Sequence, residues 1–155
     1  MAAPDEVLAA VLALLAQEHV LTLACHDAEG PWAAPVFYAL DGEELVFVSS
    51  PRTRHGLALA ASPRCAGAVH APANDWQTIA GVQLAGEVRE LGDEEATAAR
   101  AVYERRFPFV AGGDAALAAA LQRSRWYRLR LDSAVLVDNR RGLGARQRWV
   151  RTDAP

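Results

Sequence analysis

Six of seven consecutive residues near the middle of the chain can donate a hydrogen bond or a positive charge through their side chains. They comprise three hydroxyl residues and three basic ones: Ser49, Ser50, Arg52, Thr53, Arg54 and His55. An apolar run, 45–48, precedes them, and a run of helix-forming residues, 56–60, follows. Hydroxyls, guanidinium groups and the free N–H groups of a helix's first turn all bind anions. The segment therefore predicts a phosphate pocket at a strand-to-helix corner.

The same segment has a simpler interpretation. Thr53 is a good residue to cap the following helix, and the arginines then only face solvent. The density of donors beside a helix start favours the phosphate pocket, but the local pattern alone leaves both interpretations open.

No metal site is predicted from the cysteines and histidines. Cys25 and His26 are neighbours on an expected strand, and Cys65 and His70 lie five residues apart on another, so each pair points to opposite faces. Zinc needs three or four ligands, and at most one residue of each pair can reach a common point. No motif of a nucleophilic serine or cysteine occurs either, so the catalytic residues stay unknown.

The composition bounds the class of protein. A chain of 155 residues, 52% of them hydrophobic, with a net charge of −3, predicts one domain over residues 1–155 and does not favour nucleic-acid binding. The alternating cations of segment 123–130 are typical of a half-buried strand. The apolar run 7–16 is too short to span a bilayer and follows acidic residues, unlike a signal peptide. We expect a cytoplasmic protein with no contact to membranes.

Periodicity and turn residues predict the elements that hold the corner. Helices are expected over 4–17, 93–106 and 115–122, with a short helix after Thr53. Strands are expected over 19–26, 32–40, 44–50, 65–70, 78–91, 126–131, 134–138 and 147–151. Short strands joined by hairpins, with helices between and around them, predict an α+β, mainly β, antiparallel barrel.

The aromatic residues divide into two groups. Those on the expected sheet are predicted to be core: Trp32, Phe37, Tyr38 and Phe47. Trp76 lies instead in a polar connection, where it can cover a planar ligand, plug a barrel end or contact a second subunit. Pro35 within the second strand indicates a bulge or an edge position.

The order of these pieces resembles the flavin-binding split barrel of the pyridoxamine 5'-phosphate oxidase-like superfamily, and more narrowly its YhbP-like branch. The resemblance covers residues 19–151, and five segments carry it: 53–55, 81–88, 103–108, 138–144 and 149–151. It implies an antiparallel six-stranded split β-barrel of Greek-key type with peripheral helices. It also implies a bacterial homodimer with FMN at the subunit interface, acting as an oxidoreductase on an unidentified small molecule.

The resemblance further implies roles for particular residues. Thr53, Arg54 and His55 fall on the family's phosphate motif, and Ser49 on the hydroxyl residue that precedes it. Arg148 falls on a C-terminal arginine that reaches the ligand. Pro35, Val36 and Phe37, on a strand that is apolar on both faces, can supply a slot for the flavin ring. The chain departs from the true oxidases at three positions where they contact FMN: Ala33 replaces an arginine, Tyr38 a lysine and Gly81 a glutamine.

Two other interpretations keep the same barrel. In one, the pocket binds haem, with His55 or His70 as the ligand, or another planar anionic molecule. In the other, a dimeric protein retains a vestigial pocket, because cations are missing at Ala33 and Tyr38.

Overall fold

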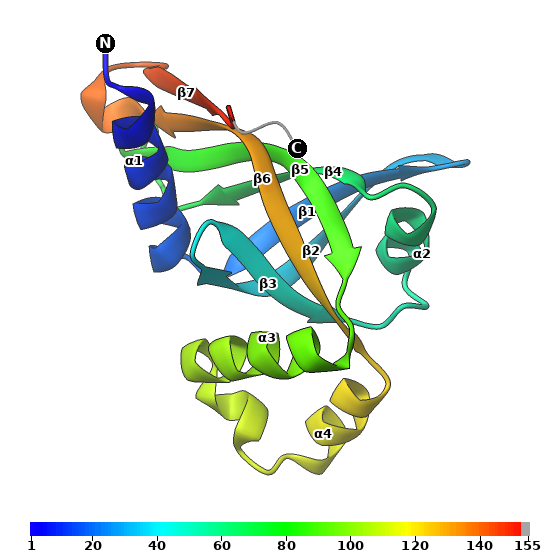
Figure 1. Cartoon of the computed structure of the whole chain (residues 1–155). Coiled ribbons are helices and arrows are strands. Elements are labelled where there is room, and N and C mark those ends of the chain that lie inside the picture. Colours follow the sequence, from blue (N-terminus) through cyan, green and yellow to red (C-terminus); the bar gives the residue numbers. More distant parts are fainter. Residues whose placement is uncertain (153–155) are drawn as a thin grey trace.

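Seven antiparallel strands form one sheet in the computed structural model, which describes residues 1–152 (Figure 1). The strands are β1 (Val20–Asp27), β2 (Gly30–Asp41), β3 (Glu44–Ser49), β4 (Arg64–His70), β5 (Ala80–Glu90), β6 (Arg125–Asp138) and β7 (Arg146–Val150). Their spatial order is β3-β2-β1-β4-β5-β6-β7, and β3 also pairs with β6. The first six strands therefore close into a ring, and β7 extends it at β6.

The ring has Greek-key connections, because β1, β2 and β3 form a meander and β4 returns to lie beside β1. The expected six-stranded split barrel is thus confirmed, with β7 as an addition. One correction concerns the strands expected over 126–131 and 134–138, which are a single strand. The pairing of β5 with β6 shifts between Ala85 and Gly86, which leaves Asp132 as the extra residue of a bulge.

Two helices cover the ends of the ring. Helix α1 (Pro4–Gln17) buries Val7, Val11, Leu14 and Leu15 against the strands. The hydroxyl of Tyr38 donates a hydrogen bond of 2.6 Å to the carbonyl oxygen of Leu15, which ties β2 to α1 inside the core. Helix α2 (Arg54–Ala61) lies at the other side of the ring and adds Ala58 and Leu59 to the same core.

A second core lies outside the ring, under helix α3 (Asp93–Arg106) (Figure 1). Helix α3 packs on β3 and the adjoining parts of β2 and β6, so that β3 is buried on both faces. The turn η2 (Pro108–Ala111) and helix α4 (Ala115–Gln122) follow it and lead back to β6. The outward side chains of β1, β4 and β5 are left without such a cover, and most of them are exposed.

Four aromatic residues were predicted to lie in the core, and two of these predictions are wrong. Tyr38 and Phe47 are buried as expected, whereas Trp32 and Phe37 are 43% and 49% exposed. Phe37 points outward because it alternates with the inward Val36 and Tyr38. It packs edge-on against Phe109, at a ring-centroid distance of 6.1 Å.

Among residues 1–152, no helix is long and apolar enough to cross a membrane.

Candidate functional site

The β3–α2 corner is a tight turn that Thr53 organises. The Thr53 hydroxyl accepts a hydrogen bond from Gly56 N at 3.0 Å and donates one to the Ser50 carbonyl at 2.9 Å. A Cβ on Gly56 would lie 2.8 Å from the Ser50 oxygen, so the turn closes only with glycine there. Thr53 thus caps α2, as the simpler sequence interpretation predicted.

His55 faces the core from the first turn of α2. Its Nε2 lies 2.7 Å from the Ser49 hydroxyl, and the side chain is buried. Burial lowers the pKa of His55 below its ordinary value, so the imidazole is neutral at pH 7. It therefore offers no positive charge to a phosphate.

Arg54 is held by the hairpin that joins β1 to β2. Its Nε and Nη2 donate to the two carboxylate oxygens of Asp27 at 2.7 and 2.9 Å. Its guanidinium carbon lies 4.4 Å from the centroid of the Trp32 ring. The hydrogen bond from Arg54 lowers the pKa of Asp27 to about 2, so this carboxylate stays ionised at any neutral pH. Asp27 thus occupies one edge of the guanidinium that the sequence assigned to phosphate.

This role of Asp27 was not predicted from the sequence. The two partners are 27 positions apart, and nothing local links them. Only the pairing of β1 with β2, which places their hairpin beside α2, brings them together.

A cavity of about 500 Å³ lies at this point, between the β1–β2 hairpin and α2. Its charged lining is balanced, with Asp27 and Glu29 against Arg52 and Arg54, and Leu57, Ala58 and Ala61 form its apolar wall.

Two neighbouring rows of outward side chains form a surface that carries no charge from β2 to β6, which we call the outer face; the row beside it, Arg64, Glu87 and Arg130, is charged. Strand pairing places one row of small residues straight across four strands: Ala33, Ala24, Ala66 and Ala85. The next row crosses six strands in the order Pro35, Thr22, Ala68, Gln83, Val135 and Arg148. Phe37 and Val20 lie beside each other at the border of these rows. Within these two rows, the charged residue is Arg148, on β7.

The predicted slot residues divide between this face and the core. Pro35 and Phe37 lie on the outer face, while Val36 points into the barrel and is buried. Pro35 lies in the part of β2 that pairs with β1 alone, since β3 joins β2 only from Tyr38 onward. The expected edge position of this proline is thereby confirmed.

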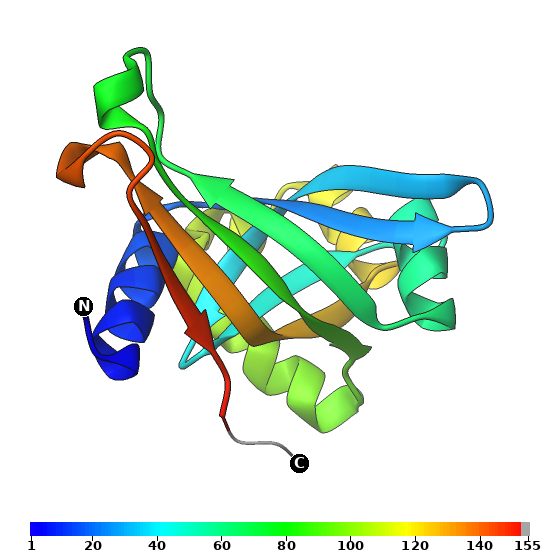
Figure 2. The same ribbon diagram turned by 90° about the horizontal axis from the view of Figure 1, so that it is seen from above.

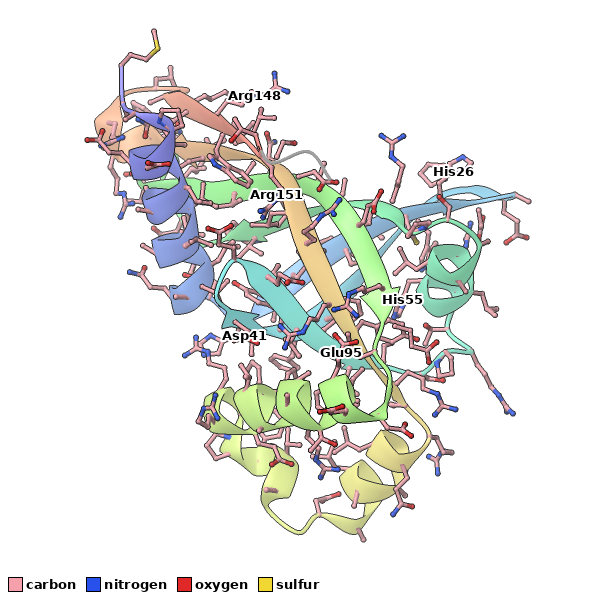
Figure 3. All side chains as sticks on the ribbon, viewed as in Figure 1. His26, Asp41, His55, Glu95, Arg148 and Arg151 are labelled. Atoms are coloured by element: carbon pink, nitrogen blue, oxygen red, sulfur yellow. The ribbon has the colours of Figure 1, made fainter. Side chains whose placement is uncertain are left out.

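Trp76 and Arg148 do not join the corner within one chain. Trp76 begins the turn η1 (Trp76–Thr78), which follows the far end of β4, while α2 precedes its near end. A strand rises about 3.3 Å per residue, so the length of β4 alone separates them by roughly 20 Å. Figure 2 shows η1 and α2 at opposite ends of the sheet, and Figure 3 shows Arg148 on β7, away from His55.

Two of the departures from the oxidases have structural causes. Tyr38 points into the core, so this position does not reach the outer face at all. A Cβ on Gly81 would lie 2.9 Å from the backbone oxygen of Val69, so no side chain fits there without a shift. Gln83, two residues on, is exposed on the outer face and carries the amide that Gly81 lacks.

His70 is a further polar group at the end of β4, where it pairs with Gly81. Its side chain is exposed, and its Nδ1 lies 3.2 Å from the carbonyl oxygen of Ala71. In each of the two cysteine–histidine pairs, the side chains lie on opposite faces of the strand, as strand alternation predicts. Cys25 and Cys65 are buried, while His26 and His70 are exposed. No group of three or more His, Cys, Asp or Glu residues within residues 1–152 could hold a metal ion.

Known proteins are similar to this chain at three levels: a family model, a related sequence and solved structures. The model of the pyridoxamine 5'-phosphate oxidase family matches residues 7–137. The UPF0306 protein YhbP of Salmonella arizonae is 35% identical over 149 residues, which cover 94% of this chain and 95% of that protein.

Among solved structures, a heme-binding protein from Mycobacterium smegmatis is similar, with a TM-score of 0.75 and 27% identity. The match covers 97% of this chain and 59% of that one. An FAD-binding protein from Mesorhizobium loti has a TM-score of 0.66 and 19% identity, over 81% of this chain and 90% of that one, and shows the shared fold.

Proposed function

The chain belongs to the pyridoxamine 5'-phosphate oxidase family, in its YhbP-like branch, and from this premise we propose that it is a homodimeric FMN-binding protein with oxidoreductase activity. The observation that carries the proposal is the outer face, whose two rows carry no charge from β2 to β6 and are largely exposed. An uncovered surface of this kind is typical of a ligand or subunit contact.

The ring of a flavin suits this face. The isoalloxazine ring is broad and apolar with one polar edge, and it needs a flat apolar support with a few hydrogen-bonding groups. The row of alanines lets a planar group approach the backbone closely, since their side chains are short. Gln83, in the neighbouring row, offers an amide to the polar edge.

The phosphate end suits the corner only in part. The free edge of Arg54 and the first-turn N–H groups of α2 can bind it. Asp27, however, competes for Arg54 and adds a negative charge beside it. The site in one chain therefore supplies less positive charge to a phosphate than the sequence motif predicted.

A second copy of the chain supplies what one copy lacks. Arg148 forms no ion pair within residues 1–152 and lies on β7, at the end of the second row of the outer face. Trp76, the first residue of η1, is 53% exposed. Two copies that bury their outer faces against each other can place these residues near the corner of the opposite copy. A dimer also explains why Phe37 and Val20 stay exposed in a single chain.

The chain's own residues then bind and shield the cofactor, while the electron transfer is the chemistry that a bound flavin supplies. No general acid or base is required of a side chain in this scheme, which is why no catalytic residue is assigned.

The experiment compares two substitutions of the same kind. Ala66→Arg places a large cation at the centre of the outer face, whereas Ala101→Arg places it on the exposed side of α3. We expect Ala66→Arg to abolish both FMN binding and dimer formation, measured by flavin fluorescence quenching and by light scattering. Ala101→Arg should preserve both. A dimer that binds FMN normally with arginine at position 66 would refute the proposal.

Haem is a second candidate, and His70 is the observation that favours it. A histidine that binds iron generally donates its other ring N–H to a carbonyl oxygen, which fixes the free nitrogen toward the metal. His70 has this arrangement through Nδ1 and Ala71, on the outer face. His55, in contrast, already uses its Nε2 with Ser49. Addition of haem should give a Soret band that His70→Ala removes; FMN binding without such a band would reject this candidate.

A further inference from the structure

A second cavity lies on the opposite side of the β3–α2 corner. Its volume is about 490 Å³, and it is bounded by the turn 50–52 and by the turn 122–125 between α4 and β6. Three guanidinium groups and two hydroxyls line it: Arg52, Arg123, Arg125, Ser50 and Ser124. We call it the arginine cavity. Ser50 and Arg52 belong to the segment that predicted a phosphate pocket, whereas no pattern in the sequence placed the residues of the second turn beside them.

The arginine cavity has no acidic residue in its lining. Arg125 pairs with Glu90, at 3.2 Å, from outside this lining. Arg52 and Arg123 have no ion pair within residues 1–152. The contrast is with the cavity at Arg54, where two carboxylates balance two arginines. Arg52 lines both cavities, and of these two only the arginine cavity has a lining with arginines and no carboxylate.

These arginines are not used to complete the end of α4. The carbonyl of Ala120 accepts from Arg123 N at 3.1 Å and from the Ser124 hydroxyl at 2.8 Å, and the carbonyl of Leu121 accepts from Ser124 N at 3.1 Å. Backbone and hydroxyl donors thus satisfy the helix end, and the guanidinium groups of Arg52 and Arg123 stay available.

We infer that the arginine cavity is an anion site that binds the phosphate group of a small molecule. Planar guanidinium groups bind phosphate oxygens through two parallel hydrogen bonds, and three of them around one cavity repel one another unless an anion lies between them. The Ser50 hydroxyl, which only accepts a hydrogen bond from Arg52 N at 3.2 Å, can add its own donor to the same oxygens. The inference does not depend on flavin binding, because the cavity is separate from the outer face.

The test is a titration with inorganic phosphate and pyrophosphate at low ionic strength, followed by amide chemical shifts of nitrogen-15-labelled protein. We expect saturable shifts at Ser50, Arg52, Arg123 and Ser124. Arg123→Gln should weaken the affinity about tenfold, as loss of a charge-assisted contact does. The matched control is Arg105→Gln on α3, an exposed arginine without an ion pair within residues 1–152, which should bind as the wild type does.

Three results would overturn the inference: shifts that never saturate and that sodium chloride reproduces, shifts centred on Arg54, or equal weakening by Arg123→Gln and Arg105→Gln. FMN and riboflavin then identify the source of the phosphate. If FMN but not riboflavin shifts the amides at 123 and 124, the occupant is the phosphate end of a flavin. If neither flavin does while inorganic phosphate binds, the occupant is another phosphorylated molecule, and the inference stands without the proposed cofactor.

Discussion

Replacement of Asp27 by asparagine tests the competition for Arg54. The carboxylate of Asp27 holds both Nε and Nη2 of Arg54, at 2.7 and 2.9 Å. Asparagine has nearly the same shape and can keep the hydrogen bond from Glu29 N, but it removes the negative charge and one strong acceptor. The guanidinium is then free to turn its fork toward a phosphate.

The expected gain concerns FMN and not riboflavin, which lacks the phosphate. A charge-assisted hydrogen bond that becomes available to the phosphate corresponds to about a tenfold lower dissociation constant for FMN. Riboflavin affinity should stay unchanged, because the outer face that supports the ring is not altered. Both dissociation constants can be measured by quenching of flavin fluorescence.

The matched control is Glu29→Gln. Glu29 lies 3.9 Å from Arg54 and is largely exposed, so its removal should have a much smaller effect. Equal tightening of FMN and riboflavin, or no change for FMN in a folded Asp27→Asn protein, would refute the idea that Asp27 limits the phosphate contact.

Three further predictions concern stability. Tyr38→Phe leaves the buried Leu15 carbonyl without its partner and should lower the free energy of unfolding in urea by about 1–3 kcal/mol. Tyr127→Phe should cost far less, because the Tyr127 hydroxyl makes no hydrogen bond within residues 1–152. Gly86→Ala would place a Cβ 2.0 Å from the Arg130 carbonyl oxygen, so thermal melting should show a loss of at least about 1–3 kcal/mol; a wild-type melting temperature would contradict the bulge geometry. The pKa of Asp27 is lowered in the fold to about 2 from 3.8, so its stabilising effect is present above pH 3.8 and is lost as the pH falls toward 2; acid titrations of wild type and Asp27→Asn should converge in that range and diverge above it.

The sequence predicted the elements better than the contacts between them. Helices 4–17, 93–106 and 115–122 have the bounds expected, because apolar periodicity and capping residues act locally. The single long β6 was not predicted, since its polar bulge at Asp132 looks like the end of a strand. The exposure of Phe37 follows strand parity, which composition alone does not reveal.

The sequence predicted which segment forms the candidate site, but not where the side chains of that segment point or which partners they contact. The corner residues lie together because they are consecutive, yet their donors face different partners: His55 the core, Arg54 the carboxylate of Asp27, and Arg52 the two cavities beside the corner. These directions depend on the partners that the tertiary fold supplies from β1, β2 and the α4–β6 turn. No spacing within the segment encodes them.

The most direct test of the proposed function is the visible absorption spectrum of the purified protein after FMN is added and the excess removed. We expect a retained flavin spectrum, close to one FMN per chain, that elutes with a dimer. A protein that remains colourless and releases all added FMN would contradict the central claim that the outer face and the corner hold a flavin.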